Sequence, residues 1–396
     1  MAPSPLAASA ASIAAAKAQR ERVLSPTRSE PSPRSPHHGL QNTVAKDFSF
    51  LQDPQAFHAL PASNVPPPFL NAPNIPTLAS PIDTLLLSGH FRLAAIAASR
   101  NIVSAASPSD HDTLFQLVHI RLACLCLISE HALAAQESKI LGDLNSAFYR
   151  HPITDAHIVP WDLRILVVRL AALGYGEWRK GIMGYYELAR ECRESIVKAD
   201  SEDEKKLWRT RLRDCGIRAA NVLVEMGDLE GAGRHLSTLP KGPESHDILV
   251  MEILVWLRVG DMHAAKRCIS SASDLDSDEL TNSSLEALIQ LADSEYAAAT
   301  SSFQALHDKF PDDAMVAQNL AVCLLYTGQI AAARNLLVDV VDASAPFHSS
   351  IFNLCTIYEL CTERNRDRKA ALAEKLATRT PDGAVNWEIQ SVDFKL

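Results

Sequence analysis

Helix-breaking residues recur at a nearly constant spacing in the second half of this chain of 396 residues. Each one separates two stretches whose composition favours helix. They are Gly227, Gly260, Ser294 and Gly328, which lie 33, 34 and 34 residues apart. A fixed period of this length is typical of a stacked array, in which each helical hairpin buries its apolar face against the next one. The spacing therefore predicts an all-α fold built from repeated pairs of helices.

The residues around each turn repeat as well. Alanine stands five residues after every turn residue, a small or apolar residue seven before it, and a larger apolar residue nine after it. The three sets are Ala232, Ala265, Ala299 and Ala333; Ala220, Ile253, Ala287 and Ala321; and Leu236, Ile269, Phe303 and Leu337. Small residues let crossing helices approach, and large ones fill the adjoining space. The pattern resembles the tetratricopeptide repeat of about 34 residues. It predicts a tetratricopeptide-repeat helical solenoid, a superhelix of antiparallel helix pairs.

Weaker copies of the pattern lie upstream. Their turns fall at Gly89, Ser129 and Gly176, and the position five residues later holds Ala94, Ala134 and Gly181. We therefore expect the repeat array to cover residues 80–379, with its most regular part at 213–345 and capping helices at 346–379. The last unit lacks a glycine turn and has a highly charged second helix, as expected for a cap that meets water. Residues 380–396 form a C-terminal tail.

The first 79 residues differ in composition from the rest. Fourteen of the 22 prolines lie between Pro3 and Pro81. A segment of this kind cannot bury enough apolar surface to offset its lost chain entropy, so we expect a disordered tail. The helix-prone stretch "LAASAASIAAAKAQRERV", from Leu6, has two interpretations: an organellar transit peptide or a transiently helical part of the tail. Its charges cluster at one end, which favours the second.

Three serines in this tail precede proline. They are Ser25, Ser32 and Ser35, and the first two have arginine close by. They fit a proline-directed kinase. Ser-Pro pairs are also common in disordered tails, and the sequence leaves both interpretations open.

The composition and motifs disfavour several kinds of chemistry. A net charge of −9 gives no reason to expect nucleic-acid binding. The eight cysteines contain no C-x-x-C pair, so we expect small buried thiols rather than a zinc site. P-loop, H-E-x-x-H and G-x-S-x-G motifs are absent from the sequence. We therefore expect no cofactor, no metal and no enzymatic activity. Apolar runs also fall short of the roughly 20 residues that span a bilayer.

Several blocks resemble the subunit-12 family of the TRAPP vesicle-tethering complex. The C-terminal blocks are "DDAMVAQNLAVCLLYTGQIAAARNLL", from Asp312, and "SSIFNLCTIYELCTERNRDRKAAL", from Ser349, followed by a tail that ends "FKL". Two further blocks are "VPWDLRILVVRLAALGYGEWRKGI", from Val159, and "LWRTRL", from Leu207. Their order also matches the family. The alanine-rich composition and the shorter tail depart from the animal pattern, so the chain resembles a fungal-like member.

The resemblance implies a non-catalytic scaffold or adaptor subunit. Its partners would be other large TRAPP subunits and, through the complex, a Rab-type GTPase and membranes. The family works in ER-to-Golgi transport and autophagy. This implies a cytoplasmic protein, peripheral to Golgi and ER–Golgi intermediate membranes. The exchange chemistry belongs to the small core subunits of the complex, so no catalytic residue is carried over to this chain.

Two other functions stay open. A co-chaperone that clamps a C-terminal carboxylate needs lysine and asparagine on the inner face of successive first helices. Asn319 and Asn353 are present, but neither helix has a lysine nearby on that face. An enzyme with an appended repeat domain would need a further ordered region, and nothing outside the repeats is long enough. A generic protein–protein adaptor also remains open on the period alone.

An apolar strip on three successive first helices is the candidate binding site. Its residues, which the repeat phase places on the concave side, are Leu254, Leu257, Leu288, Leu291, Val322, Leu325 and Tyr326. One hypothesis is that tight winding buries them between neighbouring repeats. The other is that a segment lies in this groove. That segment would come from a large TRAPP subunit or from the chain's own tail, anchored by Trp387, Ile389 and Phe394.

Overall fold

The computed structural model describes residues 46–104, 106–240, 246–272, 278–380 and 385–396. Within these residues the regular elements are helices, apart from one isolated bridge between Arg150 and His157. The α-helices of the first half are α2 (Pro67–Leu70), α3 (Ile82–Leu87), α4 (Phe91–Ser104), α5 (His111–Leu127), α6 (His131–Ser138), α7 (Trp161–Tyr175), α8 (Trp178–Lys198) and α9 (Glu202–Met226). Those of the second half are α10 (Leu229–Ser237), α11 (His246–Val259), α12 (Met262–Ala272), α13 (Glu279–Ala292), α14 (Tyr296–Lys309), α15 (Ala314–Tyr326), α16 (Ile330–Ala343), α17 (His348–Cys361) and α18 (Asn365–Ala377). The short 3₁₀ turns of the described ranges are η1 (Ser49–Gln52), η2 (Pro54–Ala56), η3 (Lys139–Leu141) and η4 (Ala147–Tyr149).

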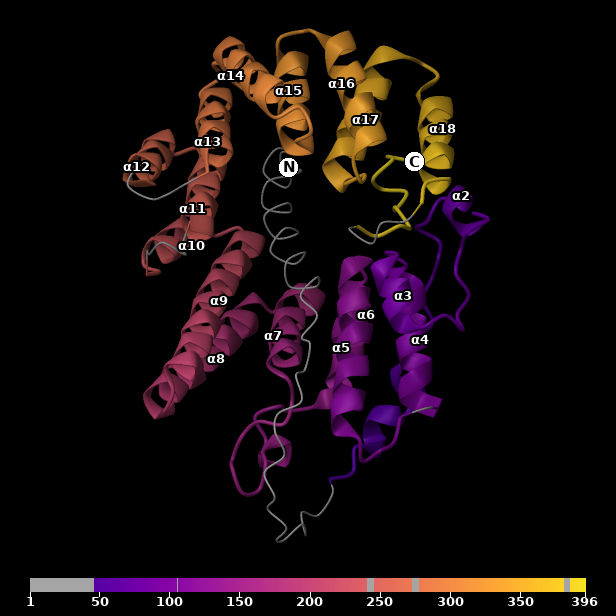
Figure 1. The fold of residues 1–396 in the computed structure, drawn as a ribbon, viewed down its shortest axis with the longest axis vertical. Helices are drawn as coiled ribbons and strands as arrows, with labels where there is room; N and C mark the ends of the chain where they lie inside the picture. The colour runs from indigo at the N-terminus through magenta and orange to yellow at the C-terminus, as the bar shows by residue number, and fades with distance from the viewer. Residues whose placement is uncertain (1–45, 105, 241–245, 273–277, 381–384) are drawn as a thin grey trace.

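The helices from α3 onward stack in chain order as antiparallel pairs (Figure 1). The pairs run from α3 with α4 to α17 with α18, and each packs against the pair before and after it. Each pair buries an apolar stripe that it could not bury alone. The all-α solenoid expected from the period is confirmed.

The turns within the pairs have the backbone that the sequence predicts. All seven predicted turn residues have positive φ: Gly89, Ser129, Gly176, Gly227, Gly260, Ser294 and Gly328. At most of these turns, the residue that follows the turn residue donates a backbone hydrogen bond to a carbonyl in the last turn of the first helix. For example, the Gln329 N–H donates to the Leu324 carbonyl at 2.8 Å. This bond closes the first helix with a left-handed residue, which glycine adopts most readily. The repeat phase is therefore correct, including at the two turns where serine replaces glycine.

The repeated alanines lie where the two helices of a pair cross. Ala232, Ala265, Ala299 and Ala333 are each 0% exposed. In the pair α7–α8 Gly181 takes this place, and a Cβ added there would lie 2.7 Å from the Ala172 Cβ. Helices in this array thus approach so closely that the crossing point tolerates only small residues.

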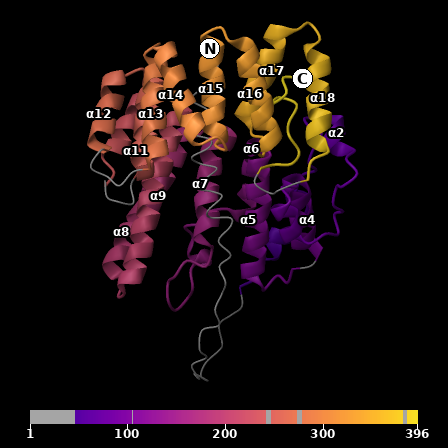
Figure 2. The same cartoon turned by 45° about the horizontal axis from the view of Figure 1, so that its top comes forward.

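The superhelix curves so far that its end returns to its beginning. Figures 1 and 2 both show α18 beside α2, and Figure 1 shows α16 to α18 above α3 to α6. One hydrophobic cluster contains Phe69 of α2, Phe303 of α14, Leu337 of α16, and Trp387 and Phe394 of the C-terminal segment. The described part of the molecule is therefore a closed ring rather than an open solenoid with two free ends.

Residues 46–79 correct the expected domain boundary. We expected a disordered tail over 1–79; residues 1–45, with Ser25, Ser32 and Ser35, lie outside the described residues. From residue 46 onward the chain packs against the repeats, and Phe48, Leu51 and Phe69 are at most 1% exposed. The average composition of this segment did not reveal that it packs on the repeats. A few buried aromatic side chains are enough to hold it there, because the helices supply the rest of the core.

A buried ion pair ties this segment to the first repeats. Arg121 of α5 donates two hydrogen bonds to Glu137 of α6, at 2.7 and 2.8 Å, and both side chains are 1% exposed. Arg121 also donates to the carbonyls of Ala95 and His58, and the His58 N–H donates to Glu137. The pair thus joins α4, α5, α6 and the proline-rich segment at one point. Charges taken out of water require such complete hydrogen bonding.

Candidate interaction surfaces

The structure places the seven strip residues on α11, α13 and α15, the first helices of three successive pairs. Leu291 is buried, and Leu288 and Leu325 pack half-buried against the same cluster. Leu254 and Leu257 pack against a second cluster around Ile253 and Ala265. Val322 is half-buried. Neighbouring repeats therefore already cover much of the strip, and its use as a docking groove stays a prediction.

Tyr326 is the one strip residue that remains exposed, at 54%. Its ring stacks on Tyr296 of α14, with centroids 4.9 Å apart and planes at 6°. This pair marks the junction between two successive repeats.

The three predicted tail anchors are buried, but they lie at the ring closure. Trp387, Ile389 and Phe394 are at most 8% exposed. Trp387 packs edge-on against Phe69 at 5.5 Å and His90 at 4.8 Å. The backbone of the segment donates from Trp387 to the Gly89 carbonyl and from Ser391 to the Asn64 carbonyl. The tail therefore seals the contact between the last pair and the first.

Two blocks that are distant in the sequence meet between α7 and α9. The Arg211 guanidinium of α9 lies 5.0 Å from the Trp161 ring and 4.6 Å from the Trp208 ring. The two indoles meet edge to face at 5.8 Å. Beside them Arg164 donates two hydrogen bonds to Glu191 of α8. Such stacked cation–aromatic contacts stabilise helix packing, so this cluster joins α7, α8 and α9.

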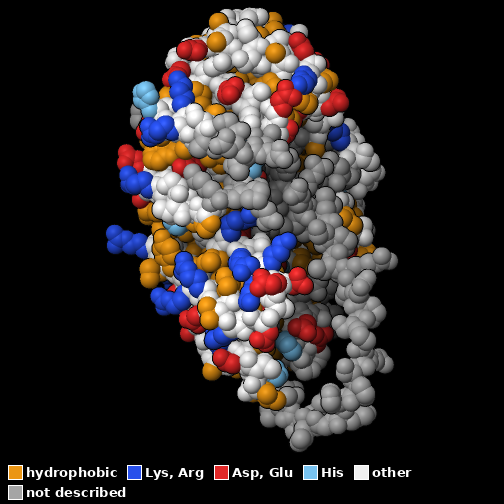
Figure 3. Space-filling view, turned by 60° about the vertical axis from the view of Figure 1, so that its left-hand side comes forward, with side chains coloured by type: hydrophobic (Ala, Val, Ile, Leu, Met, Phe, Trp, Pro, Cys, Tyr) orange, Lys and Arg blue, Asp and Glu red, His pale blue; other side chains and the backbone are white. Residues whose placement is uncertain are grey.

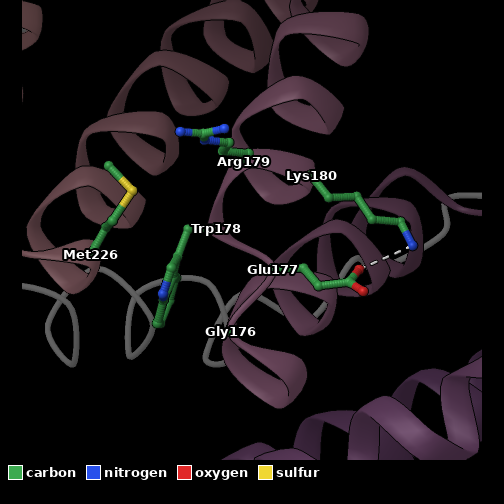
Figure 4. Close-up of a pocket in the computed structure, with 6 residues that line it drawn as sticks. All are labelled: Gly176, Glu177, Trp178, Arg179, Lys180 and Met226. Carbon is green, nitrogen blue, oxygen red and sulfur yellow. Dashed lines mark ion pairs between the residues drawn. The ribbon is translucent and has the colours of Figure 1, made fainter.

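An open hollow of about 530 Å³ lies where α7 turns into α8 and α9 ends. Gly176, Glu177, Trp178, Arg179, Lys180 and Met226 line it. In Figure 4 the Trp178 and Met226 side chains project into the same space, whereas Lys180 turns away to pair with Glu177 at 3.2 Å. The hollow thus has apolar walls and basic side chains at its edge.

Among the described residues, the side chains that could bind a metal ion do not cluster. In the part of the chain that the structure describes, no group of three His, Cys, Asp or Glu side chains could hold a metal ion. The thiols are free, and burial raises the pKa of Cys124 to about 12 and of Cys323 to about 11. Such thiols stay protonated at neutral pH and pack as small apolar groups. Among the described helices none is both long and apolar enough to cross a membrane.

The paired helices, the left-handed turns and the buried alanines define a helical-repeat protein of the tetratricopeptide type. Its candidate sites among the described residues are helix faces and one open hollow.

Comparison with known proteins confirms the resemblance seen in the sequence. The chain is similar to trafficking protein particle complex subunit 12 of Mus musculus, with 26% identity over 310 residues, and of Homo sapiens, with 26% identity over 301 residues. These alignments cover 69% and 67% of this chain but only 39% and 41% of the mouse and human proteins. The chain therefore spans about two fifths of the length of these relatives.

Two further similarities concern parts of the chain. The family profile of the coatomer epsilon subunit matches residues 200–392. Among solved structures, a tetratricopeptide repeat protein from Parabacteroides merdae is similar, with 15% sequence identity and a TM-score of 0.41. That alignment covers 67% of this chain and 93% of the bacterial one.

Sequence reasoning missed two buried or half-buried ion pairs, Arg121–Glu137 within one helix pair and Arg92–Glu388 between the first repeat and the C-terminal segment. No periodic signal marks them, because Glu388 lies outside the repeats, and Arg121 and Glu137 occupy positions of the α5–α6 pair that the repeat pattern does not include. The exposed face of α8 could have been found from the sequence, because its residues recur at helical spacing.

Proposed function

We propose that this chain is a non-catalytic scaffold subunit of a TRAPP-type tethering complex. The observation that carries the proposal is its similarity, over more than two thirds of its length, to the mouse and human subunit 12. The ring that the described residues form supports this role, because each helix pair is held between neighbouring pairs and presents a fixed outer face to other subunits. Each proposed partner would then contact preformed helix faces.

The finer parts of the proposal come from the same resemblance. The complex would support activation of a Rab-type GTPase in ER-to-Golgi transport and autophagy. This chain would contact other large subunits, and it would reach Golgi and ER–Golgi intermediate membranes from the cytoplasmic side through them. It would use no cofactor, metal or nucleic acid.

Affinity purification from the native host with mass spectrometry tests the assignment. The bait is the full chain with a C-terminal tag on a flexible linker, and a tagged repeat protein of similar size is the control. We expect TRAPP subunits to be enriched over the control. Enrichment of coatomer subunits instead, or of chaperones alone, would contradict the proposal.

An exchange assay tests the absence of catalysis. The pure chain should leave the rate of nucleotide release from Rab proteins unchanged, since we assign it no exchange site. A concentration-dependent acceleration by the pure chain would overturn the scaffold proposal. The same chain added to the assembled complex is the positive control for its folding and binding.

A further inference from the structure

The outward face of α8 carries a continuous stripe of exposed side chains. They recur at alternating intervals of four and three residues, so they share one face of the helix. The members of this α8 stripe are Arg179, Met183, Tyr186, Arg190, Arg193 and Val197, all exposed. The opposite face is buried through Gly181, Tyr185, Leu188, Ala189 and Cys192. At 1.5 Å per residue the stripe is about 27 Å long.

The apolar members of the α8 stripe are strongly exposed for their size. Met183 is 57% exposed, Tyr186 44% and Val197 85%. Solvent-facing helices usually carry polar residues there, whereas protein interfaces are enriched in methionine, tyrosine and arginine. The composition of the stripe is therefore that of an interface.

The arginines of the stripe make the surface basic. Arg179, Arg190 and Arg193 form no ion pair with any residue that the structure describes. The chain as a whole has a net charge of −9, so this positive face stands out from the bulk charge. Figure 3 shows Lys and Arg side chains gathered among hydrophobic ones on this side of the ring, at the level of α8 and α9. Guanidinium groups without a partner favour carboxylates, which they bind with two hydrogen bonds.

The hollow described above continues the stripe at its N-terminal end, because Arg179 belongs to both. Trp178 and Met226 give it apolar walls next to that arginine. Interfaces concentrate their binding energy where one large side chain fills such a socket. The hollow therefore provides an anchor point beside the charged stripe.

We propose that the α8 stripe and the adjoining hollow bind an acidic amphipathic helix of a partner protein. Carboxylates of that helix pair with the three arginines, its apolar residues cover Met183 and Tyr186, and one large apolar side chain enters the hollow. This mode of binding lays a helix along a preformed surface.

Charge favours an acidic helix as the occupant of the α8 stripe over the chain's own N-terminal segment, a second copy of the chain or a membrane. The chain's own segment from Leu6 carries Lys17, Arg20 and Arg22 against a single acid, so it would be repelled. A second copy of the chain would place arginine against arginine across the contact. A membrane would need a continuous apolar face, whereas here Arg190 and Arg193 separate Val197 from Met183 and Tyr186, and Glu187 and Glu194 flank these side chains.

Site-specific photo-crosslinking in the native host tests the proposal. The photoreactive residue benzoylphenylalanine replaces Tyr186 in the full chain, and a matched variant carries it at Glu374, which is exposed on α18. We expect the first variant alone to crosslink to a protein segment with apolar residues at helical spacing and a net negative charge. Because Tyr186 packs edge-on against His235 of α10, crosslinks within one molecule are expected in any case. Crosslinks between two copies of the chain, to a basic segment or to lipid, or none to a partner above the Glu374 variant, would overturn the proposal.

A synthetic peptide of the crosslinked segment then tests the role of charge. The double variant Arg190→Glu, Arg193→Glu should weaken its binding at least tenfold in fluorescence anisotropy, with an unchanged melting temperature. The matched control reverses Arg366 and Arg368 on the exposed face of α18 and should leave binding within twofold. Equal affinity for wild type and stripe variant would contradict the proposal. Because the peptide assay uses the isolated chain, its outcome is independent of whether TRAPP subunits co-purify.

Discussion

Arg92 of α4 and Glu388 of the C-terminal segment form a two-pronged ion pair across 296 residues of sequence. Both hydrogen bonds, Nε to Oε2 and Nη2 to Oε1, measure 2.6 Å, and the Glu388 side chain is only 3% exposed. The pair lies beside Trp387 and His90, where the last repeat meets the first. It holds the ring closed.

Breaking this pair should loosen the closure. Glu388→Ala leaves a largely buried guanidinium without its partner, which costs roughly 3 kcal/mol. We expect a lower melting temperature and faster hydrogen exchange in α3 and α4, while α11 to α14 stay protected. Glu363→Ala, at an exposed position between α17 and α18, is the control for losing a glutamate from the last repeat. Uniform exchange changes around the whole ring would contradict a local closure.

The Arg121–Glu137 pair should decide whether residues 46–60 stay packed. Arg121→Leu removes four hydrogen bonds at a site with 1% exposure and leaves a buried carboxylate, for a loss of roughly 3–5 kcal/mol. Limited proteolysis should then cut near His58 before it cuts the repeats. Arg100→Leu, at an exposed site on α4, should leave the cleavage pattern as in wild type. A protected segment in the Arg121 variant would show that the aromatic anchors alone hold it.

The crossing alanines can be tested within one helix. Ala333→Arg puts a charge at a position with 0% exposure and forces α15 and α16 apart, so stability should fall by roughly 3 kcal/mol or more. Ala332→Arg, one residue earlier and exposed, should change stability by less than about 0.5 kcal/mol. Denaturant unfolding of the two variants gives the comparison, and similar losses for both would refute the repeat phase.

Substitutions at two of the left-handed turns should change the stability of the protein in opposite directions. Gly328 has φ +80° and open space where an added methyl group would lie, so Gly328→Ala should cost roughly 1–2 kcal/mol from backbone strain alone. Ser294 has φ +68°, so Ser294→Gly relieves strain and should stabilise the protein by roughly 0.5–1 kcal/mol. Melting temperatures should therefore shift down for the first variant and up for the second. Shifts in the same direction would show that backbone strain does not control these turns.

Mild acid should destabilise the fold. Burial lowers the pKa of His90, His119, His131 and His157 below the usual 6.5. Unfolded chains bind these protons more readily, so stability present above pH 6.5 is lost as the pH falls toward the lower folded values. The melting temperature should drop between pH 7.5 and 5.5.

His348 acts in the opposite direction and provides the control. Its hydrogen bond with Asp393 raises the pKa of the imidazole, so its contribution is present below pH 6.5 and lost as the pH rises through the folded value. His348→Asn should therefore show a larger drop between pH 7.5 and 5.5 than wild type. A smaller drop would contradict the assigned direction.

The apolar strip on α11, α13 and α15 is tested by Leu288→Glu combined with Val322→Glu. Because Leu288 packs against the main cluster and Val322 is half-buried, we expect this double variant to unfold at lower denaturant concentration. A variant that keeps wild-type stability but fails to co-purify with the complex would instead identify the strip as a docking groove.

The local features of this protein could be predicted from the sequence by itself. The helix pairs, the left-handed turns from Gly227 to Gly328 and the buried alanines such as Ala299 followed from a period of 33 to 34 residues. The upstream turns at Gly89, Ser129 and Gly176 followed from the small residue five positions after each of them. Such features depend on contacts within one repeat or between neighbours, so each copy of the pattern reports the same local geometry.

Only the tertiary structure decided how the array ends and which surfaces stay open. The curvature that brings Glu388 to Arg92 accumulates from small rotations between repeats, and no single repeat encodes it. Phe48 and Phe69 are ordered because a core already exists for them, which their proline-rich surroundings could not reveal. The strip on the first helices became partly buried and the α8 stripe stayed exposed for the same reason: the exposure of a helix face depends on where the neighbouring repeats lie.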